Sequence, residues 1–554
     1  MKKKIIGICI CMLLIATAIP AVTSIKNNPI NATVPSTPQK SITGIWTEKQ
    51  KLLASDGAAG DQFGGFISLS GDTVIIGANL DVDNGADSGS AYVFTRTGTT
   101  WTPQQKLLAS DGAAGDNFGI SVSVDGDTAL IGAWYDDDNG VDSGSVYIFT
   151  RTGTTWTQQQ KLLASDGAAE DQFGWWVLLA GDTAFIGAPG DADNGVGSGS
   201  TYVFTRTGST WTQQQKLLAS DGVAGDSFGS SIAKDGDTVL IGADWDDDNG
   251  VDSGSVYVFT LVGTTWTQQQ KLLASDGIGG AYFGVSVSLS GDIALIGASR
   301  DDDNGVYSGS AYVFTRTGTT WTQQTKLLAS DGAAGDRFAV SVDLSGDTAL
   351  IGSWMDDDSG SNSGSAYVFT RTGTNWFQQQ KLHASDSAAE DMFGCNVLLS
   401  DDIAFIGAWL DDDNGVDSGS VYVFTKSENQ PPAIPTITGP AKGKVKVATA
   451  YNFTTTDPNG DEVYFFIDWG DTTNSSWIGP YPSGDIITES HTWSKKGDYT
   501  IRAKAKDIFG NESGWGILKV TMPFSYNIPF MSFWERLFER FPNAFPTLQR
   551  LLGY

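Results

Sequence analysis

Apolar and polar residues alternate along most of this chain in short runs that are typical of β-strands. Between residues 118 and 164 the runs are 118–124, 128–133, 144–150 and 156–164, and they are rich in β-branched and aromatic residues. A tight-turn signal, Asp125-Gly126, separates the first two runs. The pattern predicts four short antiparallel strands in this stretch, joined by polar loops.

The same pattern recurs seven times without an insertion. A tryptophan opens the fourth run of each copy, and these tryptophans are 55 residues apart: Trp46, Trp101, Trp156, Trp211, Trp266, Trp321 and Trp376. Four strands per unit in a regular repeat are typical of β-propeller blades. A solenoid is the alternative, but it needs polar capping repeats at both ends, and the sequence shows none.

The phase of the repeat predicts how the ring closes. The chain enters the repeat with a fourth-strand sequence, 46–54, that no first three strands precede. The last copy ends after a third-strand sequence, 419–425. We therefore expect 46–54 to complete the seventh blade, which removes two open sheet edges.

The same topology sorts the loops by face. The loops after the second and fourth strands, of the DDDNGVDSG and ASDGAAGD types, are expected on one face and make it acidic. The RTG turns between the third and fourth strands are expected on the other face, with Lys426 and Leu261 at the arginine position in two blades. The arginines of these turns are Arg96, Arg151, Arg206, Arg316 and Arg371.

The blades resemble the FG-GAP repeat of integrin α-chain propellers. The resemblance lies in Phe63-Gly64, in Ile76-Gly77-Ala78 and in the segment 89–94, and it extends over 46–425 in all seven copies. It implies a seven-bladed propeller used in extracellular recognition, often with calcium. The integrin calcium loop lies between the first two strands, where this chain has only 70–73. Because this junction is too short to surround a calcium ion, the integrin metal sites cannot be transferred.

The acidic loops after the second strands are a separate candidate for calcium, the one candidate cofactor. Closely spaced carboxylates beside an Asn and a Gly can surround a hard cation, although the spacing differs from an EF-hand. An ordinary solvated turn is the alternative explanation. The candidate ligands are Asp136, Asp138, Asp142, Asp246, Asp248, Asp252, Asp411, Asp413 and Asp417.

Aromatic residues that differ between the copies are the candidate ligand-binding residues. They fall on the acidic face, where exposed rings beside carboxylates suit the stacking of sugars. Packing between blades is the alternative role. The candidates are Trp134, Tyr135, Trp175, Trp176, Trp245, Trp354 and Trp409.

The start of the chain predicts export. Lys2, Lys3 and Lys4 precede an apolar run, 5–19, which has the length of a signal-peptide core; an uncleaved anchor is the alternative. The formal net charge of -30 argues against nucleic-acid partners. After removal of the signal only Cys395 remains, so no intrachain disulfide is expected.

The segment after the repeat resembles the PKD domain, an immunoglobulin-like β-sandwich. The resemblance lies in the WGD of 469–471, in 491–493 and in the GDYT of 497–500. Apolar residues between Phe530 and Phe541 then follow helical spacing and predict an amphipathic helix that contacts a membrane surface, an envelope partner or the sandwich. The expected parts are a signal peptide (1–24), a leader (25–44), the propeller (45–426), a linker (427–435), the sandwich (436–522) and a helical tail (523–554).

The predicted fold class is therefore all-β, and the predicted protein is secreted or held at the cell surface. We expect a non-catalytic recognition or adhesion protein whose acidic face binds a glycan or a protein. An exported polysaccharide-acting enzyme and a structural envelope component are the alternatives. Against an enzyme, the chain has two histidines, His383 on a fourth strand away from the acidic loops and His491 in the PKD-like motif, and Cys395 has no nearby base.

Overall fold

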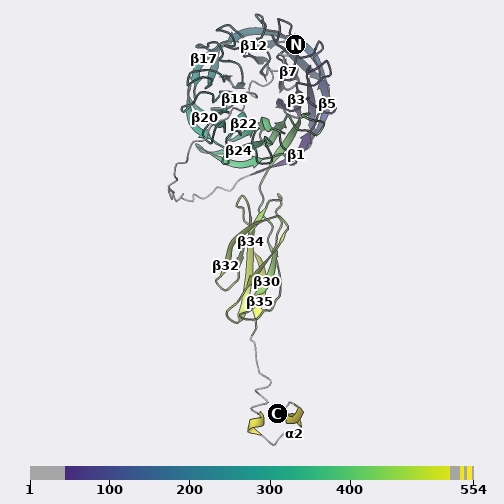
Figure 1. The fold of residues 1–554 in the computed structure, drawn as a ribbon, viewed down its shortest axis with the longest axis vertical. Coiled ribbons are helices and arrows are strands. Elements are labelled where there is room, and N and C mark those ends of the chain that lie inside the picture. Colours follow the sequence, from purple (N-terminus) through teal and green to yellow (C-terminus); the bar gives the residue numbers. More distant parts are fainter. Residues whose placement is uncertain (1–43, 524–536, 542–545, 552–554) are drawn as a thin grey trace, which may run out of the picture. The chain divides into compact units, whose positions relative to one another are not determined.

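The computed structural model describes residues 44–523, 537–541 and 546–551. Residues 45–427 form seven four-stranded antiparallel sheets arranged in a ring, so the predicted seven-bladed propeller is confirmed (Figure 1). Blades 1 to 6 take their strands in chain order, from β2–β5 to β22–β25. Blade 7 has the order β1-β28-β27-β26.

The inner two strands of each blade have four to eight residues. They are β2 (Ile67–Ser70) and β3 (Thr73–Ala78), β6 (Ser121–Asp125) and β7 (Thr128–Ala133), β10 (Val177–Ala180) and β11 (Thr183–Ala188), β14 (Ile232–Asp235) and β15 (Thr238–Ala243), β18 (Phe283–Ser290) and β19 (Ile293–Ala298), β22 (Phe338–Ser345) and β23 (Thr348–Ser353), β26 (Phe393–Ser400) and β27 (Ile403–Ala408).

The outer two strands have eight residues each. They are β4 (Ser90–Thr97) and β5 (Thr100–Leu107), β8 (Ser145–Thr152) and β9 (Thr155–Leu162), β12 (Ser200–Thr207) and β13 (Thr210–Leu217), β16 (Ser255–Val262) and β17 (Thr265–Leu272), β20 (Ser310–Thr317) and β21 (Thr320–Leu327), β24 (Ser365–Thr372) and β25 (Asn375–Leu382), and in blade 7 β28 (Ser420–Ser427) and β1 (Ile45–Leu52).

The N-terminal strand closes the ring as the phase of the repeat predicts. Strand β1 pairs with β28 in antiparallel register, with Lys51 opposite Tyr422. In Figure 1 the purple β1 lies against the green strands of the last blade. All seven blades of the propeller therefore have a fourth strand.

The first strand of blade 2 begins later than its alternating pattern suggests. Phe118 forms a parallel bridge with Gly89 of blade 1 instead of joining the sheet, and β6 begins only at Ser121. Between them Gly119 has a φ of 95°, and a Cβ atom there would lie 2.2 Å from the carbonyl oxygen of Ser90. The glycine of the Phe-Gly pair is needed because two blades approach each other at this point.

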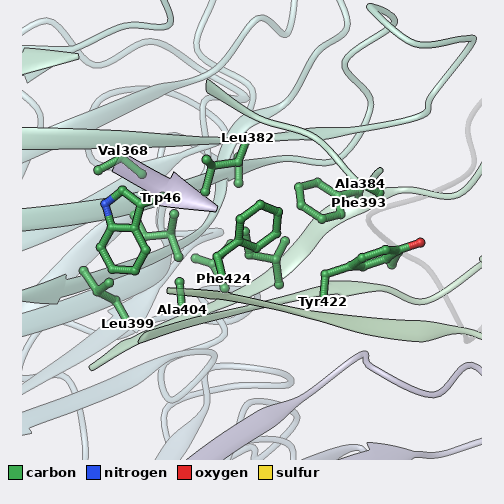
Figure 2. Packing of buried hydrophobic residues seen from close by; sticks show 14 residues of the cluster. Trp46, Val368, Leu382, Ala384, Phe393, Leu399, Ala404, Tyr422 and Phe424 are labelled. Carbon is green, nitrogen blue, oxygen red and sulfur yellow. The ribbon is translucent and has the colours of Figure 1, made fainter. Parts of the chain in front are cut away.

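The hydrophobic core lies between neighbouring blades. In Figure 2 Trp46 of blade 7 packs with Val368 and Leu382 of blade 6, while Phe393 and Phe424 extend the same cluster through blade 7. Each side chain is buried, and burial of a large aromatic side chain stabilises the fold by about 2–3 kcal/mol. Equivalent clusters recur around the ring, so each blade depends on its neighbours.

Glutamine side chains also join the outer strands of neighbouring blades. The side chain of Gln105, in β5 of blade 1, accepts a hydrogen bond from the backbone N–H of Trp156, in β9 of blade 2. It also donates one to the Trp156 carbonyl, and both bonds are 2.8 Å long. The same pair of hydrogen bonds links Gln380 of β25 to Trp46 of β1. At the one junction where the repeat has Thr325 in place of this glutamine, between blades 5 and 6, the bond to Trp376 is not formed.

The second domain is a sandwich of two antiparallel sheets. One sheet contains β29 (Thr436–Thr438), β30 (Thr449–Thr454) and β33 (Ile486–His491). The other contains β32 (Asn474–Tyr481), β31 (Val463–Asp468), β34 (Gly497–Asp507) and β35 (Gly516–Met522). Buried Trp469 and Trp493 lie in the core, and His491 stacks on Trp469 with ring centroids 4.8 Å apart.

Most of the predicted tail, the signal peptide and the leader lie outside the described residues. Within the described part of the tail, Leu537–Arg540 is helical and α2 spans Pro546–Leu551. In the ranges that the structure describes, no helix is long and apolar enough to cross a membrane.

Candidate functional site

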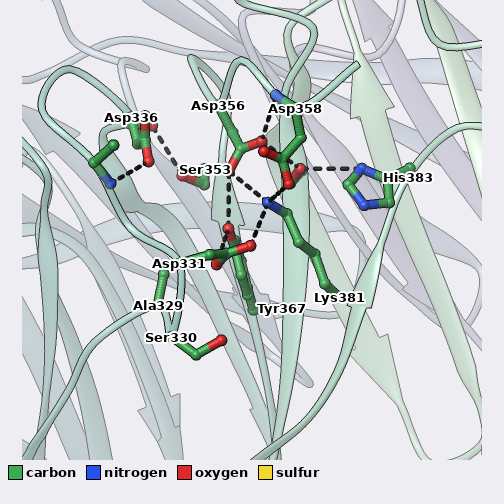
Figure 3. A network of polar contacts seen from close by, with 12 residues as sticks. Ala329, Ser330, Asp331, Asp336, Ser353, Asp356, Asp358, Tyr367, Lys381 and His383 are labelled. Atoms are coloured by element: carbon green, nitrogen blue, oxygen red, sulfur yellow. Dashed lines mark hydrogen bonds and ion pairs between the residues drawn. The ribbon is translucent and has the colours of Figure 1, made fainter. Parts of the chain in front are cut away.

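The acidic face of the propeller contains one lysine–aspartate cluster per blade. In blade 6 the Nζ atom of Lys381 lies 2.9 Å from Asp331, 2.8 Å from Asp356 and 2.5 Å from Asp358 (Figure 3). The hydroxyl of Tyr367 donates to Asp356 at 2.8 Å. Asp331 follows a fourth strand and the other two follow a second strand, so the two acidic loops share one face as predicted.

All seven blades repeat this cluster. In blade 2 Lys161 binds Asp111, Asp136 and Asp138 at 2.6–3.0 Å, and in blade 7 Lys51 of the N-terminal strand binds Asp386, Asp411 and Asp413. The cluster lysines are Lys51, Lys106, Lys161, Lys216, Lys271, Lys326 and Lys381.

The lysine is held in its charged form. Burial alone would lower the pKa of Lys161, but its hydrogen bonds to Asp136, Asp138 and Asp111 raise that pKa above its usual value. Burial would also raise the pKa of Asp111, yet the hydrogen bonds from Lys161 and Tyr147 lower it. Each cluster therefore contains its own cation.

These clusters include six of the nine predicted calcium ligands. Asp136, Asp138, Asp246, Asp248, Asp411 and Asp413 each bind a lysine ammonium group. The other three lie at a turn apart from the lysine: Asp142, Asp252 and Asp417 have a φ of 54–57°, and each donates its N–H to the carboxylate five residues earlier. The geometry thus places an ammonium group where the sequence suggested a metal ion.

Three of the predicted aromatic residues form one packed group. Trp134 stacks on Tyr135 with ring centroids 3.8 Å apart, and Trp175 of the next blade meets Trp134 edge-on at 4.4 Å. Trp134 is only 4% exposed and donates its Nε1–H to Asn117. Trp175 donates to the carbonyl of Ser230 in blade 4.

The other aromatic candidates are also packed. Trp176 donates to the Ile232 carbonyl and meets Phe66 of blade 1 edge-on, and Trp409 lies 5.7 Å from Trp354 between ring centroids. Trp354 is buried, while Trp176, Trp245 and Trp409 are half-buried. The expectation of exposed rings is therefore wrong for Trp134 and Trp354, and inter-blade packing accounts for most of this set.

A different group on the same face combines aromatic rings with arginines. Arg300 of blade 5 lies 4.1 Å from the ring centroid of Tyr282 and donates to its hydroxyl at 2.7 Å. Tyr307 lies between Arg300 and Arg337, with guanidinium carbons 5.8 and 4.6 Å from its ring centroid. Trp245 of blade 4 stacks beside Tyr282. We call Trp245, Tyr282, Arg300, Tyr307 and Arg337 the arginine–tyrosine cluster.

The sequence carries a signal for this cluster. Five of the seven propeller arginines lie in RTG turns, and Arg300 and Arg337 are the other two. Tyr307 occupies a position where most other blades have Asp or Asn, as at Asp142. Sequence reasoning found Trp245 but missed Tyr282, Arg300, Tyr307 and Arg337, which come from three different loops.

His383 and Cys395 are the histidine and the cysteine of the propeller. The expectation that His383 lies away from the acidic loops is wrong, because its Nδ1 is 3.2 Å from the Ser365 hydroxyl, which donates to Asp356 (Figure 3). Ser365 is fully buried. Burial raises the pKa of the Cys395 thiol to about 12, so it is a weak nucleophile at neutral pH.

The opposite face has a cavity of about 510 Å³ between blades 5 and 6, lined by residues that include Asp292, Arg316, Asp347 and Arg371. Its charged groups are paired, since Arg316 donates to Asp292 and Arg371 donates to Asp347, each at 2.7 Å. Arg316 also reaches Thr238 of blade 4. These contacts indicate a structural role for the RTG turns.

Comparison with known proteins finds a separate match for each of the two domains. A family model described as FG-GAP repeat matches more than half of the chain in seven segments: 46–94, 101–149, 156–204, 211–259, 266–314, 321–369 and 376–424. No curated protein matches the chain. Among solved structures, the PKD domain of an M14-like peptidase from Thermoplasmatales archaeon SCGC AB-540-F20 is similar, with 55% identity over 17% of this chain and 99% of that one, and a TM-score of 0.17.

Proposed function

The chain belongs to the FG-GAP repeat family, and from this premise we propose that it is a non-catalytic recognition protein whose acidic face binds a glycan. FG-GAP propellers are typical of adhesion and recognition outside the cell. A protein partner on the same face is the second candidate.

The arginine–tyrosine cluster is the observation that carries this proposal. The Tyr307 side chain is 43% exposed, although two guanidinium groups lie against its ring. A sugar can stack its apolar face on such a ring while its hydroxyls accept hydrogen bonds from arginine. The cluster also breaks the sevenfold symmetry of the loops, as a site for one ligand would.

An exported polysaccharide-acting enzyme is the less favoured alternative. Glycoside hydrolysis needs two carboxyl groups with different roles on either side of the scissile bond. In this propeller the clustered carboxylates bind a lysine in the same way in every blade. A structural envelope component fits the near-identity of the blades but leaves the arginine–tyrosine cluster without a role.

We further propose that the protein is secreted or displayed at the cell surface. Support comes from the positive start and apolar run of 2–19 and from the family, whose members are typically extracellular. The apolar face of 530–541, which lies mostly outside the described residues, is the proposed contact with an envelope or membrane surface. Calcium in the loops at Asp136, Asp246 and Asp411 is a weaker proposal, because lysines already neutralise those clusters.

A glycan array probed with the full chain, with calcium and with chelator, tests the proposal. The informative variant is Tyr307→Asp, because Asp occupies this position in blades 1, 2, 4 and 7 and tolerates the positive φ of 60°. Val306→Ala, at the exposed neighbouring position, is the control. We expect Tyr307→Asp to lose at least tenfold in affinity for the bound glycan and Val306→Ala to keep it.

Two results would overturn the proposal. Turnover of a polysaccharide by the full chain would establish an enzyme. A full chain that is folded but binds no glycan and no protein would favour the structural alternative.

A further inference from the structure

The face opposite the acidic loops contains one junction between blades that departs from the repeat. At three junctions the arginine of an RTG turn crosses to the preceding blade and donates to a threonine hydroxyl. These pairs are Arg151 with Thr73, Arg206 with Thr128, and Arg316 with Thr238, at 2.7–2.8 Å. In blade 5 the threonine is replaced by Ile293, so Arg371 of blade 6 finds no hydroxyl there. This link between neighbouring blades is therefore missing between blades 5 and 6.

Arg371 also lacks the aromatic contact of the other RTG arginines. Each of the other four lies over the tryptophan that opens the next strand, 5.3–5.4 Å from a ring centroid. Within residues 44–523 Arg371 makes no such contact with Trp376, which is half-buried where the equivalent tryptophans are buried. Its Nε and Nη2 groups both bind Oδ1 of Asp347, and no described residue accepts a hydrogen bond from its Nη1. Arg371 therefore keeps a donor group that the fold does not use.

The cavity of about 510 Å³ lies at this same junction. Asp292 and Ile293 line it from blade 5, and Asp347 and Arg371 line it from blade 6. Each aspartate uses Oδ1 for its arginine, and its Oδ2 accepts no hydrogen bond from the described residues. Both aspartate side chains are exposed, at 67% and 66%. The cavity thus offers one unused donor group, two carboxylate oxygens and the apolar side chain of Ile293.

The charges of the cavity favour a neutral, polar ligand. Arg316 neutralises Asp292 and Arg371 neutralises Asp347, so neither an anion nor a cation gains from a net charge there. Hydroxyl groups both donate and accept hydrogen bonds, so they can accept from Nη1 of Arg371 and donate to the two Oδ2 atoms. The C–H groups of a sugar ring can pack on Ile293. The volume of the cavity lies in the range of about 300–1,000 Å³ that is usual for small-molecule sites.

We propose that the cavity between blades 5 and 6 binds one neutral hexose unit, as a second sugar site of the propeller. Arg371 donates to a sugar oxygen, while Asp292 and Asp347 accept from sugar hydroxyls. The missing threonine at Ile293 is what leaves Arg371 available for this ligand. The site does not depend on the arginine–tyrosine cluster, because the RTG turns lie on the opposite face of the propeller.

Isothermal titration of the full chain with the methyl glycosides of glucose, galactose and mannose tests the site. For a ligand of this size we expect a Kd on the order of 10⁻³ M for at least one of them. Arg371→Leu removes the unused donor, and the repeat tolerates it because Leu261 occupies this position in blade 4. We expect this variant to bind at least tenfold more weakly. Arg206→Leu is the same change at a junction that has its threonine, and it should keep the affinity of the wild type.

Ile293→Thr tests the site without removing a charged group. The new hydroxyl stands where blades 1, 2 and 4 have the threonine that binds an arginine, so Arg371 should donate to it through Nη1. We expect sugar binding to weaken at least tenfold while the thermal midpoint stays at or above that of the wild type. Circular dichroism of each variant separates loss of binding from loss of folding. Unchanged binding in Ile293→Thr would overturn the role of the unused donor.

Three further outcomes would overturn the site. They are no binding of any of the three glycosides at about ten times the expected Kd, equal binding by wild type and Arg371→Leu, and tighter binding of glucuronate than of the glucoside. The variant Tyr307→Asp distinguishes this site from the one on the acidic face. We expect it to keep hexose binding at the junction. Loss of all hexose binding in Tyr307→Asp would instead place the sugar on the acidic face and leave that proposal intact.

Discussion

Gln380 and Trp46 are 334 residues apart in the chain and exchange two hydrogen bonds. The Trp46 N–H donates to Gln380 Oε1 at 2.9 Å, and Gln380 Nε2–H donates to the Trp46 carbonyl at 2.8 Å. The same pair of bonds joins other neighbouring blades, for example Gln270 and Trp321. The junction at which the ring closes is therefore bonded like the junctions within the repeat.

The gap at Thr325 provides a test of how much these glutamines stabilise the ring. Thr325→Gln should restore the double hydrogen bond to the backbone of Trp376, and Gln270→Thr should remove the equivalent one from Trp321. Two hydrogen bonds, less the cost of ordering the side chain, contribute about 1 kcal/mol. Chemical denaturation of the propeller should show opposite shifts of the midpoint in the two variants.

The control for this pair is Gln214→Thr, which changes a glutamine that bonds only within its own strand, to Thr212. Its midpoint should stay within the error of the wild type. If Thr325→Gln and Gln214→Thr behave alike, the double hydrogen bonds do not contribute to the stability of the ring.

The lysine–aspartate clusters predict a strong effect of removing one lysine. In Lys161→Met the largely buried Asp136 loses its cation, and removing one partner of a buried ion pair costs about 3–5 kcal/mol. Because Asp111 and Asp138 are half-exposed, water screens their charges and reduces this cost. We therefore expect the free energy of unfolding to fall by about 2 kcal/mol.

Equilibrium denaturation at pH 7 measures this loss of stability. Lys49→Met, at an exposed position of β1, is the matched control and should change stability little. Equal losses in the two variants would mean that the cluster is only a surface ion pair.

The sequence predicted the propeller well because its signals are local and repeated. The tryptophans at 55-residue intervals and the fourth-strand sequence at 46–54 were enough to predict the blades and the closure of the ring, which the structure confirms. The candidate site was predicted less well. Asp136 and Asp138 are close together in the sequence, whereas Lys161 lies on another strand of the blade and approaches them only in the fold.

A second class of aspartates predicts how propeller stability depends on pH. Burial raises the pKa of Asp116 to about 6. The hydrogen bond from the Ala113 N–H lowers this pKa, whereas the negative charge of Asp136 raises it further. A carboxyl whose pKa is raised in the fold favours the protonated state, so stability falls as the pH rises from about 4 to above 6. Asp336 and Asp391 behave in the same way.

Asp111 and its equivalents have the opposite effect. Their pKa values are lowered in the fold, so they contribute stability above the unfolded pKa of 3.8, which is lost as the pH falls below it. Thermal unfolding should therefore show a maximum near pH 5. Asp116→Asn should flatten the decline between pH 5 and pH 7, and Asp302→Asn, in an exposed loop, should leave the profile unchanged.

Trp134 distinguishes packing from ligand binding among the aromatic residues of the acidic face. Its ring is enclosed by Tyr135, Trp175 and Asn117, so Trp134→Ala should create a cavity and cost about 3–4 kcal/mol of stability. Tyr307→Asp should cost little, because its ring is partly exposed and most other blades carry Asp or Asn at that position. Denaturation and glycan affinity measured on both variants should therefore give opposite results. If Trp134→Ala instead abolishes binding at unchanged stability, recognition belongs to blades 2 and 3, and the arginine–tyrosine cluster is structural.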